Sequence, residues 1–367
     1  MPSTSPARIT QNFNQTLEQY RNNALKSNDP QVQFDFANYL IDASEALSDP
    51  KAKSALQQEA IKIVRKLTTQ NAGKVSFPEA HFFLAEAFGK GLYGLSISHD
   101  KAFGYYLQGS KQNHPAATYR VGVCYELGAG TKKDFGRAVN FYRKAASLGD
   151  PLSMHKLGMI LLNGWLGQPK NPKEGVTWLK RTVNMSDNPQ ALHDLAACYE
   201  TPNCPAVLQD ESYALELYKK AAEQGYAPSL YKVGCFYEYG QLGCSVDPEQ
   251  SIENYKKAAD QHYSDAELAL SGWYLTGVEG VLKQSDTDAY VYARKAADQK
   301  NAKAEYAVGY FSEKGIGVKP DIEEAKRWYS RSAAQGYQRA AERLKEIKKG
   351  KYHLKNEKKS PDSCIIM

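Results

Sequence analysis

The fold is decided by a stretch that reads ATYRVGVCYELGAG over residues 117–130. The same frame recurs as SLYKVGCFYEYG over residues 229–240 and as AEYAVG from Ala304. Looser copies begin at Ala80, Ser153, Ala191 and Ala266. Successive copies start 36 to 38 residues apart. This period lies in the range of helical solenoids and exceeds the ~34 residues of tetratricopeptide repeats.

Each repeat has a second half, which reads AVNFYRKAA over residues 138–146. Further copies occupy residues 214–222, 251–259, 289–297 and 325–333. The apolar positions in each half fall at i, i+3, i+4 and i+7, which is one stripe along a helix. A helix pair cannot bury such a stripe alone, whereas stacked pairs bury a continuous core. The sequence therefore predicts an all-α fold, a right-handed α-solenoid of antiparallel helix pairs.

The pattern weakens towards both ends, which predicts five segments along the chain. These are a polar, disordered N-terminus (1–29), a capping helix pair (30–77), seven repeats (78–338), a capping helix (339–350) and a basic flexible tail (351–367).

The net charge of +6 lies near the C-terminal end. Between Arg343 and Lys359 there are eight Lys or Arg and two Glu, so the rest of the chain sums to about zero. A nucleic-acid-binding body would present a basic face, and we expect no nucleic-acid partner. The sequence also has no apolar signal core and no run of roughly 20 apolar residues. We therefore expect the protein to remain on the cytoplasmic side of membranes.

The last four residues form a C-a-a-X motif, which predicts farnesylation of Cys364 by a prenyltransferase that reads Ile365, Ile366 and Met367. One lipid chain gives only reversible membrane binding, so a second signal is expected. The candidate second signal is a set of lysines that would contact an anionic membrane surface. These are Lys348, Lys349, Lys351, Lys355, Lys358 and Lys359. The alternatives are a chance four-residue match and a merely solvated tail.

No catalytic motif accompanies the repeat. The sequence lacks a phosphate-binding G-x-x-x-x-G-K-[ST] loop, H-E-x-x-H and G-x-S-x-G. Glu126, Glu238 and Glu313 recur at one repeat position, which favours pairing or capping at a helix end over acid–base chemistry. The six cysteines contain no C-x-x-C pair, so zinc is not expected. We predict a protein that is not an enzyme and has no metal or cofactor, apart from the covalent farnesyl group.

A stack of helix pairs offers an extended face on which a protein partner could bind. Candidates for a partner groove are residues at non-core positions of the first helices. They are Arg120, Lys156, Asp194, Lys232, Glu267 and Glu305. Their signs are mixed, and a solvated face is the competing interpretation for each residue.

The repeat resembles the Sel-one-like repeat, whose pattern is A-x-Y-x-L-G-x-x-Y-x-x-G-x-G followed by A-x-x-W/Y-Y-x-K-A-A. The resemblance covers Ala80 to Gly336 and is strongest over Ala304 to Ala334. Some copies depart from it: His155 replaces the first tyrosine of its repeat, and Ala196 replaces the glycine of the next. These departures change local geometry but leave the fold prediction intact.

The stretch FDFANYLIDA over residues 34–43, together with the terminal CIIM, resembles the fungal chitin synthase regulatory factors. That resemblance implies a non-catalytic scaffold that activates and localises a membrane chitin synthase for septal and cell-wall chitin synthesis. It implies a lipid-anchored protein at the plasma membrane of the septum or bud neck, where septum or bud-neck adaptors could also bind. The alternative is a prenylated adaptor for another membrane-associated signalling or stress pathway.

Overall fold

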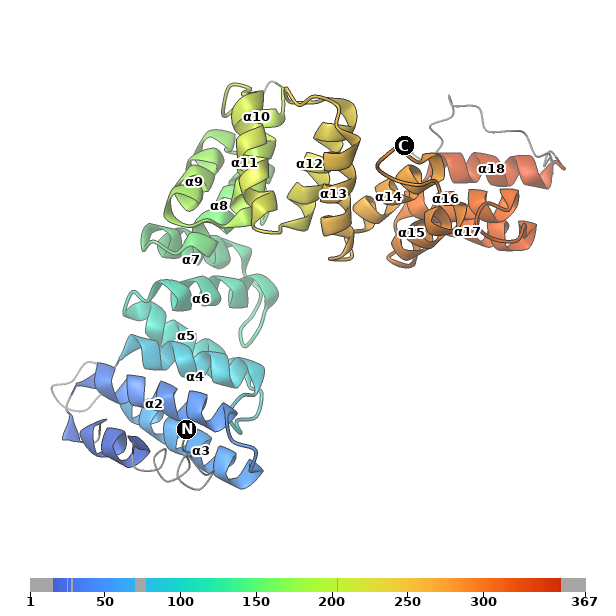
Figure 1. The fold of residues 1–367 in the computed structure, drawn as a ribbon. Coiled ribbons are helices and arrows are strands. Elements are labelled where there is room, and N and C mark those ends of the chain that lie inside the picture. The colour runs from blue at the N-terminus through green and yellow to red at the C-terminus, as the bar shows by residue number, and fades with distance from the viewer. Residues whose placement is uncertain (1–15, 25, 28, 70–76, 203, 351–367) are drawn as a thin grey trace, which may run out of the picture. The chain divides into compact units, whose positions relative to one another are not determined.

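The computed structural model describes residues 16–350 except residues 25, 28, 70–76 and 203. Within these residues the chain forms helices joined by short loops, with one isolated bridge between Val278 and Leu282 and no β-strand. The predicted all-α fold of helix pairs is confirmed (Figure 1). The helices group into two compact units, with the division between Met185 and Ser186.

The first unit contains four helix pairs. Its helices are α2 (Pro30–Glu45), α3 (Pro50–Thr68), α4 (Pro78–Lys90), α5 (His99–Lys111), α6 (Pro115–Leu127), α7 (Phe135–Ser147), α8 (Pro151–Asn163) and α9 (Pro172–Met185). The two helices of each pair pack together, and the second helix of each pair packs on the first helix of the next.

The second unit repeats this arrangement and adds one final helix. Its helices are α10 (Pro189–Glu200), α11 (Glu211–Glu223), α12 (Ala227–Tyr239), α13 (Pro248–Ala259), α14 (Ser264–Thr276), α15 (Asp286–Asp298), α16 (Ala302–Lys314), α17 (Ile322–Ala334) and α18 (Gln338–Lys348). The last helix, α18, packs on α17 as a further first helix would.

The helix ends follow from local chemistry. Asp134 and Asp321 accept hydrogen bonds from the first backbone N–H groups of α7 and α17, which would otherwise lack partners. Five first helices, α4, α6, α8, α12 and α16, end on a left-handed glycine such as Gly128, and the residue two positions on again has a positive φ. That second position is a glycine at Gly130 but Leu166 in a later repeat. The loop inside each of these pairs therefore turns in the same way.

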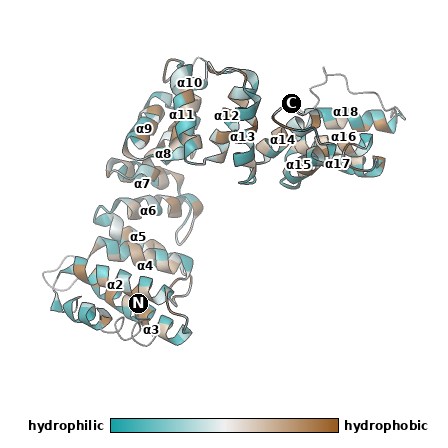
Figure 2. Cartoon of the chain, in the orientation of Figure 1, coloured by the Kyte–Doolittle hydropathy of each residue, from teal (hydrophilic) through white to brown (hydrophobic). Residues whose placement is uncertain are grey.

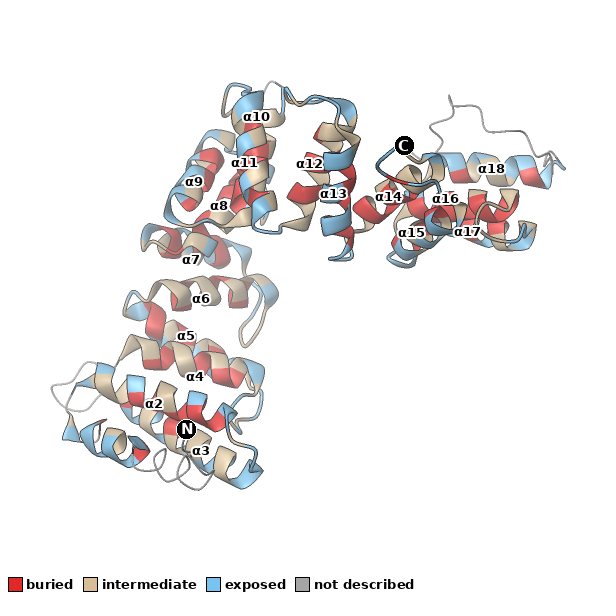
Figure 3. Ribbon diagram, viewed as in Figure 1, coloured by how far each residue is buried: buried red, intermediate tan, exposed pale blue. Residues whose placement is uncertain are grey.

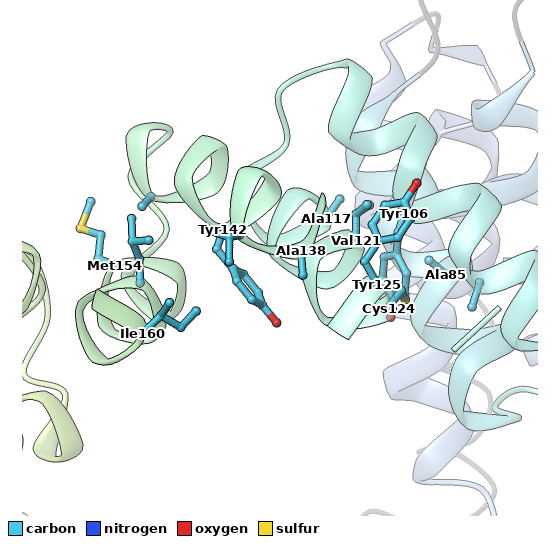
Figure 4. Close-up of a cluster of buried hydrophobic side chains, with 14 of the residues drawn as sticks. Ala85, Tyr106, Ala117, Val121, Cys124, Tyr125, Ala138, Tyr142, Met154 and Ile160 are labelled. Carbon is cyan, nitrogen blue, oxygen red and sulfur yellow. The ribbon is translucent and has the colours of Figure 1, made fainter. Parts of the chain in front are cut away.

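In three repeats the core is a tyrosine ring placed against a glycine: Gly122 with Tyr142, Gly234 with Tyr255 and Gly309 with Tyr329. A Cβ atom on Gly122 would lie 2.6 Å from Tyr142 Cε1, and Gly234 has the same relation to Tyr255. Figure 4 shows Tyr142 beside Ala138, within the cluster that also holds Val121. Small residues on the first helix therefore allow a large ring on the second to be fully buried. The buried stripes face neighbouring helices and the polar residues face outwards (Figures 2 and 3).

The prediction that residues 1–29 are disordered is wrong for part of that segment. Residues 16–24 are helical, with Leu17 and Ala24 buried against α2 and α3. Arg21 fixes this helix by donating from Nη2 to Glu59 Oε2 of α3 at 2.7 Å. The apolar stripe of this helix has few residues and is surrounded by polar ones, so the sequence pattern did not reveal the helix. That α2–α3 and α18 act as caps of the stack stays a prediction.

Candidate functional site

A recurring trio of side chains joins several repeats to the next helix pair or to the final helix α18. In the best-defined copy, Glu126 near the end of α6 accepts a hydrogen bond from the Tyr142 hydroxyl of α7. Lys156, on the first helix of the following repeat, places Nζ 2.9 Å from Glu126 Oε1. We call this arrangement the staple. It links three consecutive helices through one carboxylate.

Three further complete staples are present among the described residues. They are Glu86 with Tyr106 and Arg120, Glu200 with Tyr218 and Lys232, and Glu313 with Tyr329 and Arg343. In the first of them the carboxylate comes from one helical turn earlier, because Gly89 occupies the repeat position of Glu126. Glu238 accepts from Tyr255 at 2.6 Å, but Ala269 stands where the cation would be.

In two of the staples, the carboxylates of Glu86 and Glu313 are ionised acceptors rather than proton donors. Burial pushes the pKa of Glu313 upwards, but hydrogen bonds from Arg343 and Tyr329 outweigh burial and hold that pKa below its usual range. The pKa of Glu86 is also lowered, because hydrogen bonds from Lys90 and Tyr106 outweigh the upward effect of burial. The buried tyrosine partners have raised pKa values, because burial and the adjacent carboxylate disfavour a phenolate. The staples therefore act as structural ion pairs with a neutral tyrosine, as the sequence prediction of pairing at a helix end implied.

Two repeats lack the staple, and there its residues change together. In the repeat of α8 and α9, Leu162 replaces the glutamate and Leu179 replaces the tyrosine. In the repeat of α14 and α15, Leu275 and Ala293 stand at these positions. A buried polar group without its partner costs stability. Because of this cost, we expect the glutamate and the tyrosine of one repeat to be replaced together, as they are in these two repeats.

The candidate groove residues have different environments. Arg120, Lys156 and Lys232 are staple cations, and each keeps about a third of its side chain exposed. Asp194, on α10, is half-buried and already makes an interaction with its surroundings. Contact of any of these residues with a partner stays a prediction.

Glu267 and Glu305 do not suit a groove. Each residue is 1% exposed. Glu267 accepts a hydrogen bond from Gln299 at 2.7 Å, and Glu305 accepts one from Gln335 at 2.6 Å. Burial raises the pKa of Glu267. Each glutamate belongs to the first turn of a first helix and is covered by the end of the second helix of the same repeat. A partner could not reach them without opening that repeat, which corrects their place in the predicted groove.

The described residues contain no group of three or more His, Cys, Asp or Glu side chains that could hold a metal ion. The thiols of Cys124 and Cys198 are weak nucleophiles, because burial raises the pKa of Cys124 to about 11 and that of Cys198 to about 12. His193 lies 2.8 Å from the Ser229 hydroxyl and packs edge-on against Tyr218, as a packing residue would. These side chains suit a scaffold that acts by binding partners through its surface.

The predicted membrane anchor lies almost wholly outside the described residues. Lys348 is the last residue of α18 and Lys349 caps it, and both are exposed. Cys364, Ile365, Ile366 and Met367 are not among the described residues, nor are the tail lysines Lys351, Lys355, Lys358 and Lys359. Among the helices of the described part, none is long and apolar enough to cross a membrane.

The near-zero net charge of the repeat body is the sum of two regions of opposite net charge. Residues 78–185 carry fourteen Lys or Arg and seven Asp or Glu, a net of +7. Residues 186–338 carry fifteen Lys or Arg and twenty-three Asp or Glu, a net of −8. Sequence reasoning that summed the whole body missed this division, although counting charge repeat by repeat would have found it. The division falls where the structure separates its two compact units.

Comparison with known protein families identifies the repeat. The model of the Sel1 repeat matches seven consecutive segments. They are residues 78–114, 115–150, 151–187, 189–226, 227–263, 264–301 and 302–342. Each segment contains one first helix and one second helix, so the seven repeats recognised in the sequence are confirmed.

Curated relatives are fungal regulatory proteins. Chitin synthase regulatory factor 3 of Schizosaccharomyces pombe is 37% identical over 84% of this chain and 34% of its own length. Chitin synthase regulator SKT5 of Malassezia restricta is 42% identical over 90% of this chain and 24% of its own length. Activator of C kinase protein 1 of Saccharomyces cerevisiae is 30% identical over 81% of this chain and 52% of its own length. This chain therefore spans about half or less of these relatives.

Two solved structures have the same fold. A protective antigen of uropathogenic Escherichia coli that displays an SLR fold aligns with a TM-score of 0.71 at 23% identity, over 94% of this chain and 69% of its own. A Sel1 repeat protein from Oxalobacter formigenes aligns with a TM-score of 0.61 at 24% identity, over 90% of each chain. At these identities the likeness concerns the fold.

Proposed function

This chain belongs to the Sel1 repeat family, a family of repeat scaffolds rather than enzymes, and we propose that it regulates a chitin synthase. The observation that carries this proposal is the 37% and 42% identity to two fungal chitin synthase regulators across most of the chain. The matched region spans most of the chain rather than one repeat. A scaffold of this kind acts by binding and placing its partner, since it brings no chemistry of its own.

The proposed mechanism is recruitment at a membrane. Farnesylation of Cys364 would tether the chain to the cytoplasmic face of the plasma membrane at the septum or bud neck, and the neighbouring lysines would strengthen that contact. Confining a scaffold to the membrane raises its effective concentration near a membrane enzyme without any new contact. Exposed Lys348 and Lys349 at the end of α18 support a basic start to this tail.

The repeat body would supply the partner-binding surface. The staples pair Arg120, Lys156 and Lys232 with partly buried carboxylates, so the exposed parts of these cations are held at fixed positions on α6, α8 and α12. A surface held in place before binding loses less conformational entropy on binding a partner. Arg120 and Lys156, which lie in the same compact unit, are therefore the best remaining candidates for contact with an acidic segment of the enzyme, and Lys232 is a separate candidate on the second unit.

The test compares a Cys364→Ser strain with wild type, using membrane fractionation and the chitin content of the septum. A Cys244→Ser strain is the matched control, because that cysteine is half-buried in the loop between α12 and α13. We expect Cys364→Ser to become soluble and septal chitin to fall, while the control behaves as wild type. If Cys364→Ser stays on membranes with normal chitin, the anchor proposal is wrong.

A second candidate function is suggested by the similarity to Activator of C kinase protein 1. In this alternative the chain is a membrane adaptor for a signalling or stress pathway. The same strains separate the two functions. A Cys364→Ser protein that becomes soluble without any loss of chitin would support the signalling adaptor and contradict regulation of chitin synthase.

A further inference from the structure

The loops inside the helix pairs of the first unit lie along one edge of the stack. All first helices of the unit run in the same direction, so each connection to a second helix emerges on the same side. Contacts agree with this. A Cβ atom on Gly130 would lie 2.1 Å from the carbonyl oxygen of His99, so the loop 128–134 rests against the start of α5. Leu166 of the next loop packs on the buried cluster whose members come from α4 to α8. We call this side, residues 91–101, 128–137 and 164–174 together with Leu127, the loop edge.

Exposed apolar side chains concentrate on the loop edge. In the described part of residues 78–185, most of the exposed large hydrophobic side chains lie there: Leu92, Ile97, Leu127, Phe135 and Trp165. Ile97 is 63% exposed, Leu127 68% and Trp165 49%. Single exposed apolar residues are ordinary, whereas several along one side mark a binding surface.

The charge of the loop edge is basic and differs from that of the second unit. Its loops and first turns hold six Lys or Arg and three Asp or Glu. The equivalent segments of the second unit hold two Lys or Arg and ten Asp or Glu. These segments are residues 201–213, 240–250, 277–288 and 315–324. Lys132, Lys133 and Lys170 are exposed beside the apolar residues, and Lys133 Nζ lies 4.8 Å above the Phe135 ring.

We propose that the loop edge docks directly on an anionic lipid surface. Isolated apolar tips separated by lysines match the boundary between headgroups and acyl chains, where tryptophan rings and lysine side chains are favoured. Lysines close to an anionic leaflet are attracted to it. An acidic protein would satisfy the lysines but would leave separated tips such as Ile97 and Trp165 without a shared pocket. The acidic loops of the second unit would be repelled by the same surface.

This inference rests on the proposed membrane location and deepens it, but its test needs neither a chitin synthase nor a prenyl group. The full chain is prepared without prenylation, with the tail lysines Lys348, Lys349, Lys351, Lys355, Lys358 and Lys359 replaced by alanine. Binding is measured by co-sedimentation with vesicles of phosphatidylcholine, with and without phosphatidylserine. The loop-edge variant is Ile97→Ser with Trp165→Ser, and the matched control is Leu208→Ser with Val246→Ser in loops of the second unit.

We expect the tail-neutral chain to bind only the anionic vesicles. The loop-edge variant should weaken that binding by about tenfold or more, because both apolar anchors are lost. The control should bind as the parent does, with the same circular dichroism and Tm. Trp165 fluorescence should shift to the blue on anionic vesicles, and the shift should vanish in Trp165→Phe. The proposal is overturned if the tail-neutral chain does not bind. It is also overturned if both variants bind equally, or if the loop-edge change alters only self-association.

Discussion

At the scale of single residues, the staple explains why half-buried glutamates persist in this stack. A carboxylate such as Glu126 loses hydration when the next repeat packs over it. It regains stability from two donors, the Tyr142 hydroxyl and Lys156 Nζ. Hydrogen bonds to charged groups contribute about 1.5–3 kcal/mol each. Removing one of these donors should therefore destabilise the fold more than removing one partner of an exposed ion pair would.

The staple predicts strong coupling between its members. Glu126→Leu and Tyr142→Leu introduce the residues that stand at these positions as Leu162 and Leu179. Each single change leaves a polar partner without its bond, so the double variant should be more stable than the sum of the two costs implies. We expect a coupling of about 1–2 kcal/mol in urea unfolding. Additive costs within about 0.3 kcal/mol would show that the staple does not act as a unit.

Stability should also depend on pH through Glu313. Because Arg343 and Tyr329 hold its folded pKa below the unfolded value of about 4.3, its contribution is fully present above that unfolded value. The contribution is lost as pH falls through the lower, folded pKa. Unfolding followed by circular dichroism between neutral pH and about pH 3 should show a shallower acid loss in Glu313→Gln. Glu253→Gln, at an exposed pair with Lys257, should keep the wild-type slope.

The glycine beneath the tyrosine in three of the repeats is a third residue-level constraint. An alanine Cβ at position 234 would lie 2.6 Å from Tyr255 Cε1, and the ring is fully buried. Gly234→Ala should therefore destabilise the fold by about 1–3 kcal/mol through overpacking. The control is Gly272→Ala in α14, where a Cβ would meet nothing within 4 Å. That change should be neutral or stabilising by up to about 1 kcal/mol, because alanine favours helix. Equal effects in thermal unfolding would contradict the packing argument.

At the scale of elements, the first described helix has a clear role. Residues 16–24 cover the outer side of α2 and α3, with Tyr20 packed between Phe36 and Tyr39. An uncovered end of a repeat stack would expose its apolar stripe. This helix therefore finishes the apolar surface that the first pair leaves open.

Loss of that cover should destabilise the N-terminal pair first. Leu17→Ala removes a buried side chain and should cost about 2–3 kcal/mol. Hydrogen exchange should then speed up in α2 and α3 before it does in α6. Gln19→Ala, at an exposed position of the same helix, serves as the control and should change neither stability nor exchange. Unchanged exchange in the Leu17 variant would mean that the helix is only loosely attached.

How far the sequence predicts these elements depends on how often a pattern recurs. The helix pairs were predictable because Gly122, Gly234 and Gly309 repeat in one frame with buried aromatics. The pairing of Glu126 was predictable for the same reason. The helix at residues 16–24 occurs once, so no repeat revealed it. The burial of Glu267 and Glu305 was missed because a glutamate in the first turn of a helix usually faces water, and only the position of Gln299 and Gln335 buries it.

At the scale of the whole molecule, the repeats within each compact unit pack on their neighbours along the chain. Stability in such stacks is a sum of repeat terms and nearest-neighbour terms. The two charge groups therefore follow the sequence directly, with the basic repeats in residues 78–185 and the acidic repeats in residues 186–338. The basic repeats belong to the first compact unit and the acidic repeats to the second. This is why a total charge near zero was a poor guide to the surfaces of the body.

Damage at one end of the stack should fade with distance along it. Trp328→Ala in α17 removes a buried ring and should cost about 3–5 kcal/mol locally. Hydrogen exchange should rise most in α16 to α18, less in α14, and little in α6. A uniform rise in exchange across all repeats would contradict nearest-neighbour stability. The exposed change Leu208→Ser provides the baseline.

The joint replacement of staple residues also bears on how such a chain can evolve. A lineage that exchanges glutamate for leucine at one staple passes through an intermediate in which the tyrosine hydroxyl is stranded, and the reverse order strands the carboxylate. Point mutation would cross this barrier slowly. Unequal recombination that copies an entire repeat of about 37 residues would carry all members of the set at once. The repeat, rather than the residue, is then the natural unit of inheritance, and consensus engineering should exchange whole repeats.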